Sequence, residues 1–198
     1  SRASVGAAGL LGGLAPAAVG IGLYAVWLAV EMAVLRPARD RSGGDVDRHS
    51  LLVLASSNLL APACAIAVHL LGVGALSVPA HWQWPGLVLM LVGIAIRWSG
   101  IHTLRRFFSA NVAVQRDHRL IVAGPYRWVR HPGYFGGWLM FAGLGVALAN
   151  WVALLVLAVL TVPAFLYRIA VEERALRGAF PEYAAYASTV RKFIPFLW

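Results

Sequence analysis

The sequence has few charged residues for its length. Only 13% of its 198 residues are charged, and 60% are hydrophobic, with a mean hydropathy of +0.72. A soluble domain usually carries about 25% charged residues and roughly 45–50% apolar residues. This composition excludes an ordinary soluble domain. It indicates one integral membrane domain spanning residues 1–198.

Cysteine is almost absent, since Cys64 is the single one in the sequence. One cysteine excludes a disulfide framework and a paired-cysteine metal site. No cluster of histidine, cysteine and aspartate has ligand spacing, so we expect no metal. The apolar sequence of residues 5–35 is too long for the core of a cleavable signal peptide, and we predict none.

Acidic residues are also scarce, with 8 against 17 basic residues and a net charge of +9. Such a balance is compatible with nucleic-acid binding. However, the basic residues flank hydrophobic segments and form no nucleic-acid-binding pattern, so membrane topology explains them better. We therefore expect no nucleic-acid partner.

Five apolar segments are each close to the roughly 20 residues that a helix needs to cross a bilayer. They cover residues 12–35, 51–78, 85–104, 133–149 and 151–167. The last two meet at Asn150, so tight a connection that we predict an antiparallel helical hairpin. Residues 172–190 have apolar residues at helical spacing and predict an amphipathic helix at the membrane interface. The predicted fold is all-α, with about five transmembrane helices.

The basic residues lie almost entirely on one side of this predicted topology. Alternate sides of the membrane hold 16 and 1 of the lysines and arginines. By the positive-inside rule, the N-terminus is outside and the C-terminus is cytoplasmic. We expect the inner membrane of a prokaryote, with the polar motifs described next on its cytoplasmic face.

A polar stretch, residues 118–136 (HRLIVAGPYRWVRHPGYFG), separates two apolar segments. Pro132 holds His131 extended and suits the first turn of the next helix. The unpaired N–H groups of that turn favour an anionic group, and Gly133 and Gly136 allow close approach. Tyr126 and Tyr134 add hydroxyls and aromatic faces. We interpret the stretch as the wrapping of a polar cofactor.

A second polar group follows the last apolar segment. Arg168 and Glu172 are four residues apart and share a helix face, which on its own indicates only a surface ion pair. Ionisable groups next to a membrane segment are often functional, however. Arginine can hold a carboxylate with two hydrogen bonds. We interpret the pair Glu172–Glu173 as closing the cofactor pocket.

Two further ionisable residues lie within apolar segments. Arg97 is in the third segment, and Glu31 is near the cytoplasmic end of the first. They could pair across helices, or Arg97 could extend to the interface by itself. The sequence leaves both arrangements open.

Two separated motifs resemble one known family. GPYRWVRHPGYFGG, then a short hairpin, then EERALRGAFPEYAAYASTVRKFIP is similar to the isoprenylcysteine carboxyl methyltransferase family and its phospholipid N-methyltransferase relatives. The resemblance runs from about Gln115 to the C-terminus. One departure is Phe180–Pro181, where the family often has Phe-Gly.

The resemblance implies S-adenosylmethionine as the methyl donor, bound in a core of about residues 115–198. It also implies a lipidic or lipidated acceptor from the bilayer and no obligate protein partner. Arg168 would hold the acceptor carboxylate. The residues that would line the cofactor site are Gln115, His118, Leu120, Ile121, Tyr126, His131, Pro132, Tyr134 and Glu172.

The type of acceptor stays open at this level. A carboxylate with a pKa near 4 is ionised at neutral pH and needs no general base. A lipid amine must lose a proton, for which His131 and Glu173 are candidate bases. Two competing hypotheses of function are an NADPH-dependent enzyme of the sterol-reductase type and a non-catalytic protein that retains the cofactor loop.

Overall fold

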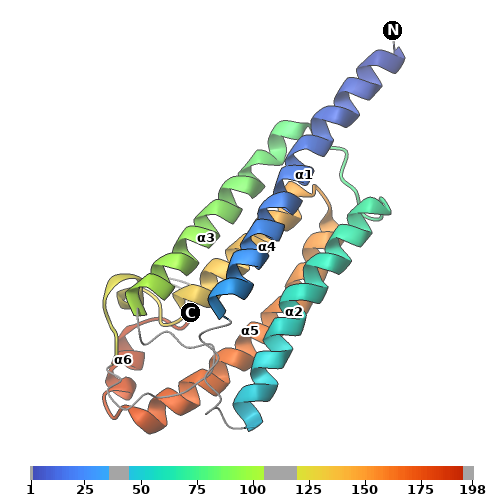
Figure 1. The fold of residues 1–198 in the computed structure, drawn as a ribbon. Helices are drawn as coiled ribbons and strands as arrows, with labels where there is room; N and C mark the ends of the chain where they lie inside the picture. The colour runs from blue at the N-terminus through green and yellow to red at the C-terminus, as the bar shows by residue number, and fades with distance from the viewer. Residues whose placement is uncertain (1, 36–44, 105–119, 194–198) are drawn as a thin grey trace.

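The computed structural model describes residues 2–35, 45–104 and 120–193. These residues form six α-helices and two short 3-10 helices, which confirms the all-α fold. In Figure 1, helices α1 to α5 run in roughly the same direction along the bundle. In chain order the elements are α1 (Arg2–Leu35), α2 (Asp45–Leu70), η1 (Ala80–Trp82), α3 (Trp84–Leu104), η3 (Gly124–Arg127), α4 (Pro132–Ala147), α5 (Trp151–Ala179) and α6 (Tyr183–Thr189).

Four segments are long and apolar enough to cross a membrane. They are Pro16–Val34, Asp47–Leu70, Ala80–Leu104 and Trp151–Ala179. Helix α4 has only 16 residues, which corresponds to about 24 Å, against roughly 30 Å for the hydrocarbon core. That α4 is the fifth membrane span therefore stays a prediction.

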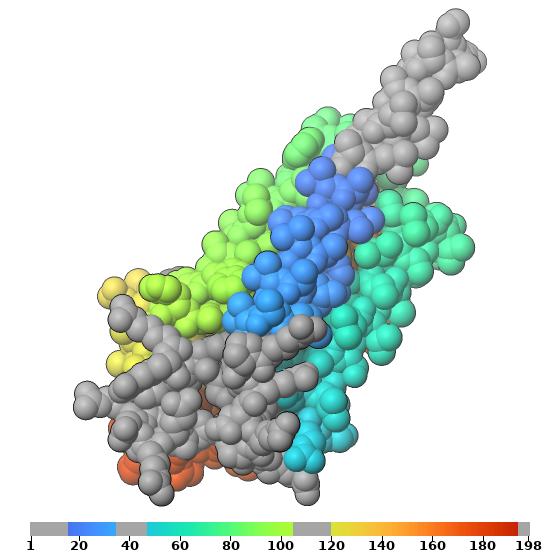
Figure 2. Space-filling view, viewed as in Figure 1, coloured from blue at the N-terminus to red at the C-terminus, as the bar shows by residue number. Residues whose placement is uncertain are grey.

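Large apolar side chains are exposed along the long helices, as expected for surfaces in contact with lipid. Figure 2 shows α1, α2 and α3 side by side on one face of the helix bundle. Exposed examples on these helices are Val19, Val26, Leu52, Leu59, Leu60, Val88 and Leu91.

The tight turn between α4 and α5 confirms the predicted hairpin. Asn150 caps α5, because its side-chain oxygen accepts a hydrogen bond from the N–H of Ala153 at 2.8 Å. Its Nδ2 donates to the carbonyl of Val73, also at 2.8 Å. Ala149 adopts a left-handed backbone with a φ of 46°. One asparagine thus fixes both the hairpin and the loop that follows α2.

Glycines bring α3 and α4 into backbone contact. A Cβ added to Gly93 would lie 2.5 Å from the carbonyl oxygen of Gly136, and one added to Gly143 would lie 2.5 Å from that of Gly86. Both helices repeat these glycines every seven residues, so the pairs oppose each other two turns apart. Helices in membranes often associate through small residues in this way. α4 therefore lies in the middle of the bundle, packed against both α3 and α5.

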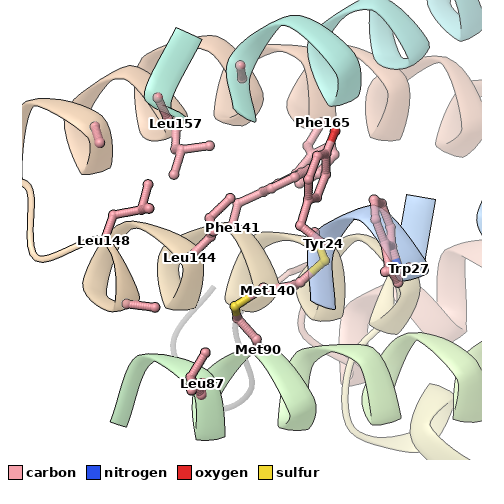
Figure 3. Close-up of a cluster of buried hydrophobic side chains, with 14 of the residues drawn as sticks. Tyr24, Trp27, Leu87, Met90, Met140, Phe141, Leu144, Leu148, Leu157 and Phe165 are labelled. Carbon is pink, nitrogen blue, oxygen red and sulfur yellow. The ribbon is translucent and has the colours of Figure 1, made fainter. Parts of the chain in front are cut away.

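The buried core surrounds α4. Phe141 contacts Tyr24 and Trp27 of α1 and Phe165 of α5, with ring centroids 6.0–6.4 Å apart. Figure 3 shows this aromatic group beside the methionines and leucines of α3 and α4. The core holds the beginning of α4 in a fixed position relative to α5, and this is where the polar motifs lie.

Several element boundaries differ from the prediction, since α1 and α2 begin earlier and α2 and α5 end at other residues. The second segment was predicted to reach residue 78, but α2 ends at Leu70, followed by glycines 72 and 74 with positive φ. The amphipathic segment predicted over residues 172–190 is not one helix. Its first part continues α5 to Ala179, because Glu, Arg, Ala and Leu are strong helix formers. The extended conformation of Phe180, followed by Pro181, ends α5 before the short α6.

The glycine contact predicts the effect of one added methyl group. Gly93→Ala should force α3 and α4 apart, because the new Cβ meets backbone atoms that cannot move independently. We expect a loss of about 1–3 kcal/mol in stability, measured as a lower thermal midpoint in detergent. Gly22→Ala on α1 is the matched control, because a Cβ added there would have no described atom within 4 Å. Equal midpoints for the two variants would contradict the close packing.

Candidate cofactor and acceptor site

The candidate site lies where α5 extends past its apolar part. Arg168, Glu172 and Glu173 are on this extension, beside the loop of residues 120–131 and the first turn of α4. In Figure 1 this is the end of the bundle where α6 lies. Residues about 40 positions apart in the sequence meet here.

Tyr134 and Glu172 form the contact that joins the two motifs. The Tyr134 hydroxyl donates a hydrogen bond to Glu172 Oε2 at 2.9 Å. His131 is close by, with its Nδ1 4.0 Å from the same oxygen. The Glu172 side chain is 32% exposed. The predicted meeting of the two motifs is therefore observed, with one carboxylate still open to a ligand.

Glu173 has a different environment from Glu172. Its Oε1 accepts a hydrogen bond from Arg130 Nε at 2.9 Å and is 3.2 Å from His131 Nε2. Its Oε2 lies 3.6 Å from Arg177 and 3.9 Å from Lys192. The side chain is only 7% exposed. Several cations thus hold Glu173 in place, which makes it a structural anchor and a poor candidate for the base.

Arg130 also holds the C-terminal segment against the loop. Its NH1 donates to the carbonyl oxygens of Ala187 at 2.8 Å and Val190 at 2.5 Å. Its backbone N–H donates to the carbonyl of Arg191 at 2.8 Å. No role for Arg130 is predicted from the sequence, although its place directly before His131 in the motif is a usable signal.

Two tyrosines strengthen this attachment. The Tyr186 hydroxyl donates to the carbonyl oxygen of Tyr126 at 2.6 Å. Burial raises the pKa of Tyr186 to about 12, so the hydroxyl keeps its proton at neutral pH. Burial, and next the nearby charge of Glu172, also raise the pKa of Tyr126. Both hydroxyls are therefore neutral groups.

Arg168 is buried and bound to α2. Its NH1 donates to Asp47 Oδ1 at 2.5 Å, to Ser50 Oγ at 2.6 Å and to the Asp47 carbonyl at 3.2 Å. Tyr134 lies close enough to Arg168 to interact with its charge. Asp47 could not be predicted from the sequence, because only the packing of α2 on α5 brings it to Arg168, 121 residues away.

Arg97 and Glu31 pair across helices, which decides between the two arrangements that the sequence leaves open. Arg97 Nε donates to Glu31 Oε2 at 2.9 Å, and its NH2 contacts Glu31 Oε1. Arg97 NH1 also donates to the carbonyl oxygen of Gly133 at 3.2 Å. This pair connects α1 and α3 to the first turn of α4.

The remaining predicted residues occupy the loop or lie outside the described part. Leu120 and Ile121 are half-buried in the extended segment before η3, Tyr126 is in η3, and Pro132 begins α4. Gln115 and His118 lie outside the described residues. Within the described ranges, no group of three or more His, Cys, Asp or Glu side chains could hold a metal.

The Arg130 contacts predict how the tail is held. Arg130→Ala should remove the donors to residues 187 and 190 and leave buried Glu173 short of a partner. Breaking a buried pair costs about 3–5 kcal/mol. We expect faster hydrogen exchange over residues 183–193, measured by mass spectrometry. Arg127→Ala, exposed in the same loop, should leave exchange unchanged. Equal protection in both variants would contradict the anchoring role.

Comparison with known proteins connects this geometry to a family. Residues 86–178 match the model of the Isoprenylcysteine carboxyl methyltransferase (ICMT) family. Protein-S-isoprenylcysteine O-methyltransferase A of Arabidopsis thaliana is 35% identical over 123 residues, which cover 59% of this chain and 62% of that protein. The cobalt-zinc-cadmium resistance protein CzcN of Cupriavidus metallidurans is 30% identical over 122 residues, covering 58% and 55% of the two chains.

A solved structure shares the fold. It is described as the eukaryotic intramembrane Ras methyltransferase ICMT, and it matches with a TM-score of 0.59 and 22% identity over 92% of this chain and 68% of that one. The aligned region spans less than two thirds of the length of these two curated relatives. The resemblance predicted from the two motifs is confirmed, because residues 86–178 of this integral membrane protein match the isoprenylcysteine carboxyl methyltransferase family model.

Proposed function

We propose that this protein is an S-adenosylmethionine-dependent membrane methyltransferase. We propose that its acceptor is a lipidic carboxylate of the isoprenylcysteine type. The observation that carries the proposal is the contact of Tyr134 with Glu172, which unites the two family motifs in one polar cluster. Several relatives are protein-S-isoprenylcysteine O-methyltransferases by name, which supports the reaction type.

The residues of the cluster fit the groups of this methyl donor. The open carboxylate of Glu172 can accept hydrogen bonds from ribose hydroxyls or an ammonium group. In the described structure no side chain caps the N-terminus of α4, so its first N–H groups can receive a carboxylate. The proposed lining lies around the N-terminus of α4. It comprises Tyr126, His131, Pro132 and Tyr134, and would be completed by Leu120, Ile121, Gln115 and His118. The bound donor would supply a methyl group on a positively charged sulfur.

The role proposed for Arg168 is to hold the acceptor carboxylate. An oxygen of that carboxylate would form a bond to the methyl carbon while the carbon–sulfur bond breaks and its electron pair returns to sulfur. The products are a methyl ester and S-adenosylhomocysteine, and no proton moves. The protein therefore needs no base and must place the reacting atoms about 3–3.5 Å apart. The buried position of Arg168 suits such positioning.

An amine acceptor is the second candidate. Its supporting observation is that Asp47 already neutralises Arg168, so the site carries less positive charge than the sequence indicated. The base would then be His131, because Glu173 is held by Arg130.

We further propose that the site faces the cytoplasm of a prokaryotic cell. The support is the charge asymmetry, since 16 of 17 basic residues lie on the side of the site in the predicted topology. A soluble methyl donor and a lipidic acceptor would then reach the cluster from the cytosol and the bilayer.

Ligand titration of the purified protein tests the proposal. We expect S-adenosylhomocysteine to bind and NADPH not to bind in isothermal calorimetry. Glu172→Gln should weaken this binding about tenfold, because it removes a charge-assisted hydrogen bond of about 1.5–3 kcal/mol. Arg168→Lys should keep the affinity but lose most turnover, since lysine cannot serve both Asp47 and an acceptor with a planar fork.

Glu182→Gln is the control, because this carboxylate is exposed beside α6. Binding of NADPH alone would replace the proposal with a reductase, and binding of neither ligand would favour a non-catalytic protein. An equal loss of S-adenosylhomocysteine affinity in the Arg168 and Glu172 variants would show that Arg168 binds the cofactor and not the acceptor.

A further inference from the structure

Arg97 and Glu31 form an ion pair between two of the segments that can span a membrane. Their side chains are 14% and 5% exposed, so both charges are largely removed from solvent. Charged groups in such a place are costly unless they are paired, and they often serve a function. Glu31 accepts hydrogen bonds from two nitrogens of Arg97, Nε and NH2. The third nitrogen, NH1, can therefore bind a different group.

The group that NH1 binds is in the first turn of α4. Arg97 NH1 donates to the carbonyl oxygen of Gly133 at 3.2 Å. The backbone of Arg97 is also close to α4, because a Cβ added to Gly136 would lie 2.7 Å from the backbone nitrogen of Arg97. Both the side chain and the backbone of Arg97 thus contact the beginning of α4.

Two tyrosines of the proposed cofactor lining lie near Arg97. Tyr134 directly follows Gly133, and Arg97 is close enough to Tyr126 and Tyr134 for its charge to act on both. Gly100 lies one turn after Arg97 on α3, and a Cβ added to it would lie 3.6 Å from the Tyr126 hydroxyl. This face of α3 therefore lies against the first turn of α4 and the loop before it.

We propose that Arg97, held by Glu31, fixes the first turn of α4 and so directs the Tyr134 hydroxyl to Glu172. Arg97 is then a positioning residue of the methyl-donor site, because it acts through Tyr134 and not on the donor itself. This inference rests on the proposed function. The planar fork of arginine suits this role, since it can donate to a carboxylate and to the carbonyl of Gly133 at the same time.

The test substitutes lysine, which keeps the charge but has a single nitrogen. In Arg97→Lys this nitrogen cannot reproduce the fork that serves both Glu31 and Gly133. With the full chain, we expect S-adenosylhomocysteine to bind about tenfold more weakly than to wild type in isothermal calorimetry. In a Tyr134→Phe background, the same substitution should weaken binding by about threefold or less, because the hydroxyl that Arg97 directs is then absent.

Leu144→Ala is the matched control for a loss of stability. Leu144 is fully buried in α4, about three helical turns beyond Gly133. Removing its side chain should lower the thermal midpoint at least as much as Arg97→Lys does. The affinity for S-adenosylhomocysteine, measured well below both midpoints, should stay at the wild-type value.

Hydrogen exchange of the ligand-free protein gives a second measurement, which does not depend on the proposed function. The N–H groups of residues 136–138 are the first in α4 that can pair within the helix. We expect them to exchange faster in Arg97→Lys than in wild type or Leu144→Ala, measured by mass spectrometry. If Arg97→Lys does not fold, Glu31→Gln replaces it, because this variant keeps the arginine and weakens only its support. The affinity loss should then be about threefold, and absent in the Tyr134→Phe background.

Three outcomes would overturn the inference. A lower thermal midpoint of Arg97→Lys with unchanged affinity would make the ion pair only a structural link between α1 and α3. An equal affinity loss with and without the Tyr134 hydroxyl would show that Arg97 does not act through Tyr134. Unchanged exchange at residues 136–138 would show that Arg97 does not fix this turn. If wild type does not bind S-adenosylhomocysteine, the proposed function fails, and hydrogen exchange alone decides whether Arg97 fixes the turn.

Discussion

The unbroken course of α5 is the constraint on which the site depends. The helix begins at the Asn150 cap and ends at Ala179, so it continues well beyond the apolar part that its hydropathy predicts. A continuous helix of this length carries Glu172 and Glu173 to the first turn of α4, where the other motif lies. Because successive helical side chains point about 100° apart, the two carboxylates must face different surroundings. One is enclosed by Arg130 and His131, and the other remains open beside Tyr134.

Buried ion pairs connect the helices at the same end of the bundle. Glu31–Arg97 joins α1 to α3, Asp47–Arg168 joins α2 to α5, and Arg130–Glu173 joins the loop before α4 to α5. Charges near hydrocarbon are expensive unless they are paired, so each pair restricts which helices can be neighbours. The apolar contacts around Phe141 and the glycines of α3 and α4 then fix the distances between the helices. The ion pairs thus hold the polar site at one end of the bundle. Close packing of apolar side chains and glycines fixes the helices along the rest of their length.

The parts of the structure that depend on local sequence pattern could be predicted. The all-helical fold and the hairpin at Asn150 follow from hydropathy and turn length, and the structure confirms them. The extension of α5 was missed because Glu172–Arg174 interrupts the hydropathy without interrupting helix propensity. Asp47 was missed because its role exists only after α2 packs on α5. The glycine contact could have been predicted from spacing, since small residues repeated on one helix face predict a close helix neighbour. The pairs with seven-residue spacing are Gly86 with Gly93 and Gly136 with Gly143.

The central claim is that Tyr134 and Glu172 act together on one bound molecule. A double-mutant cycle of Tyr134→Phe and Glu172→Gln, read as affinity for S-adenosylhomocysteine, measures this coupling directly. Residues that contact each other and share a ligand usually couple by about 0.5–3 kcal/mol. We predict that the double variant loses less binding free energy than the sum of the two single losses, by at least about 0.5 kcal/mol. Strictly additive losses, or no effect of either substitution on binding, would contradict the account.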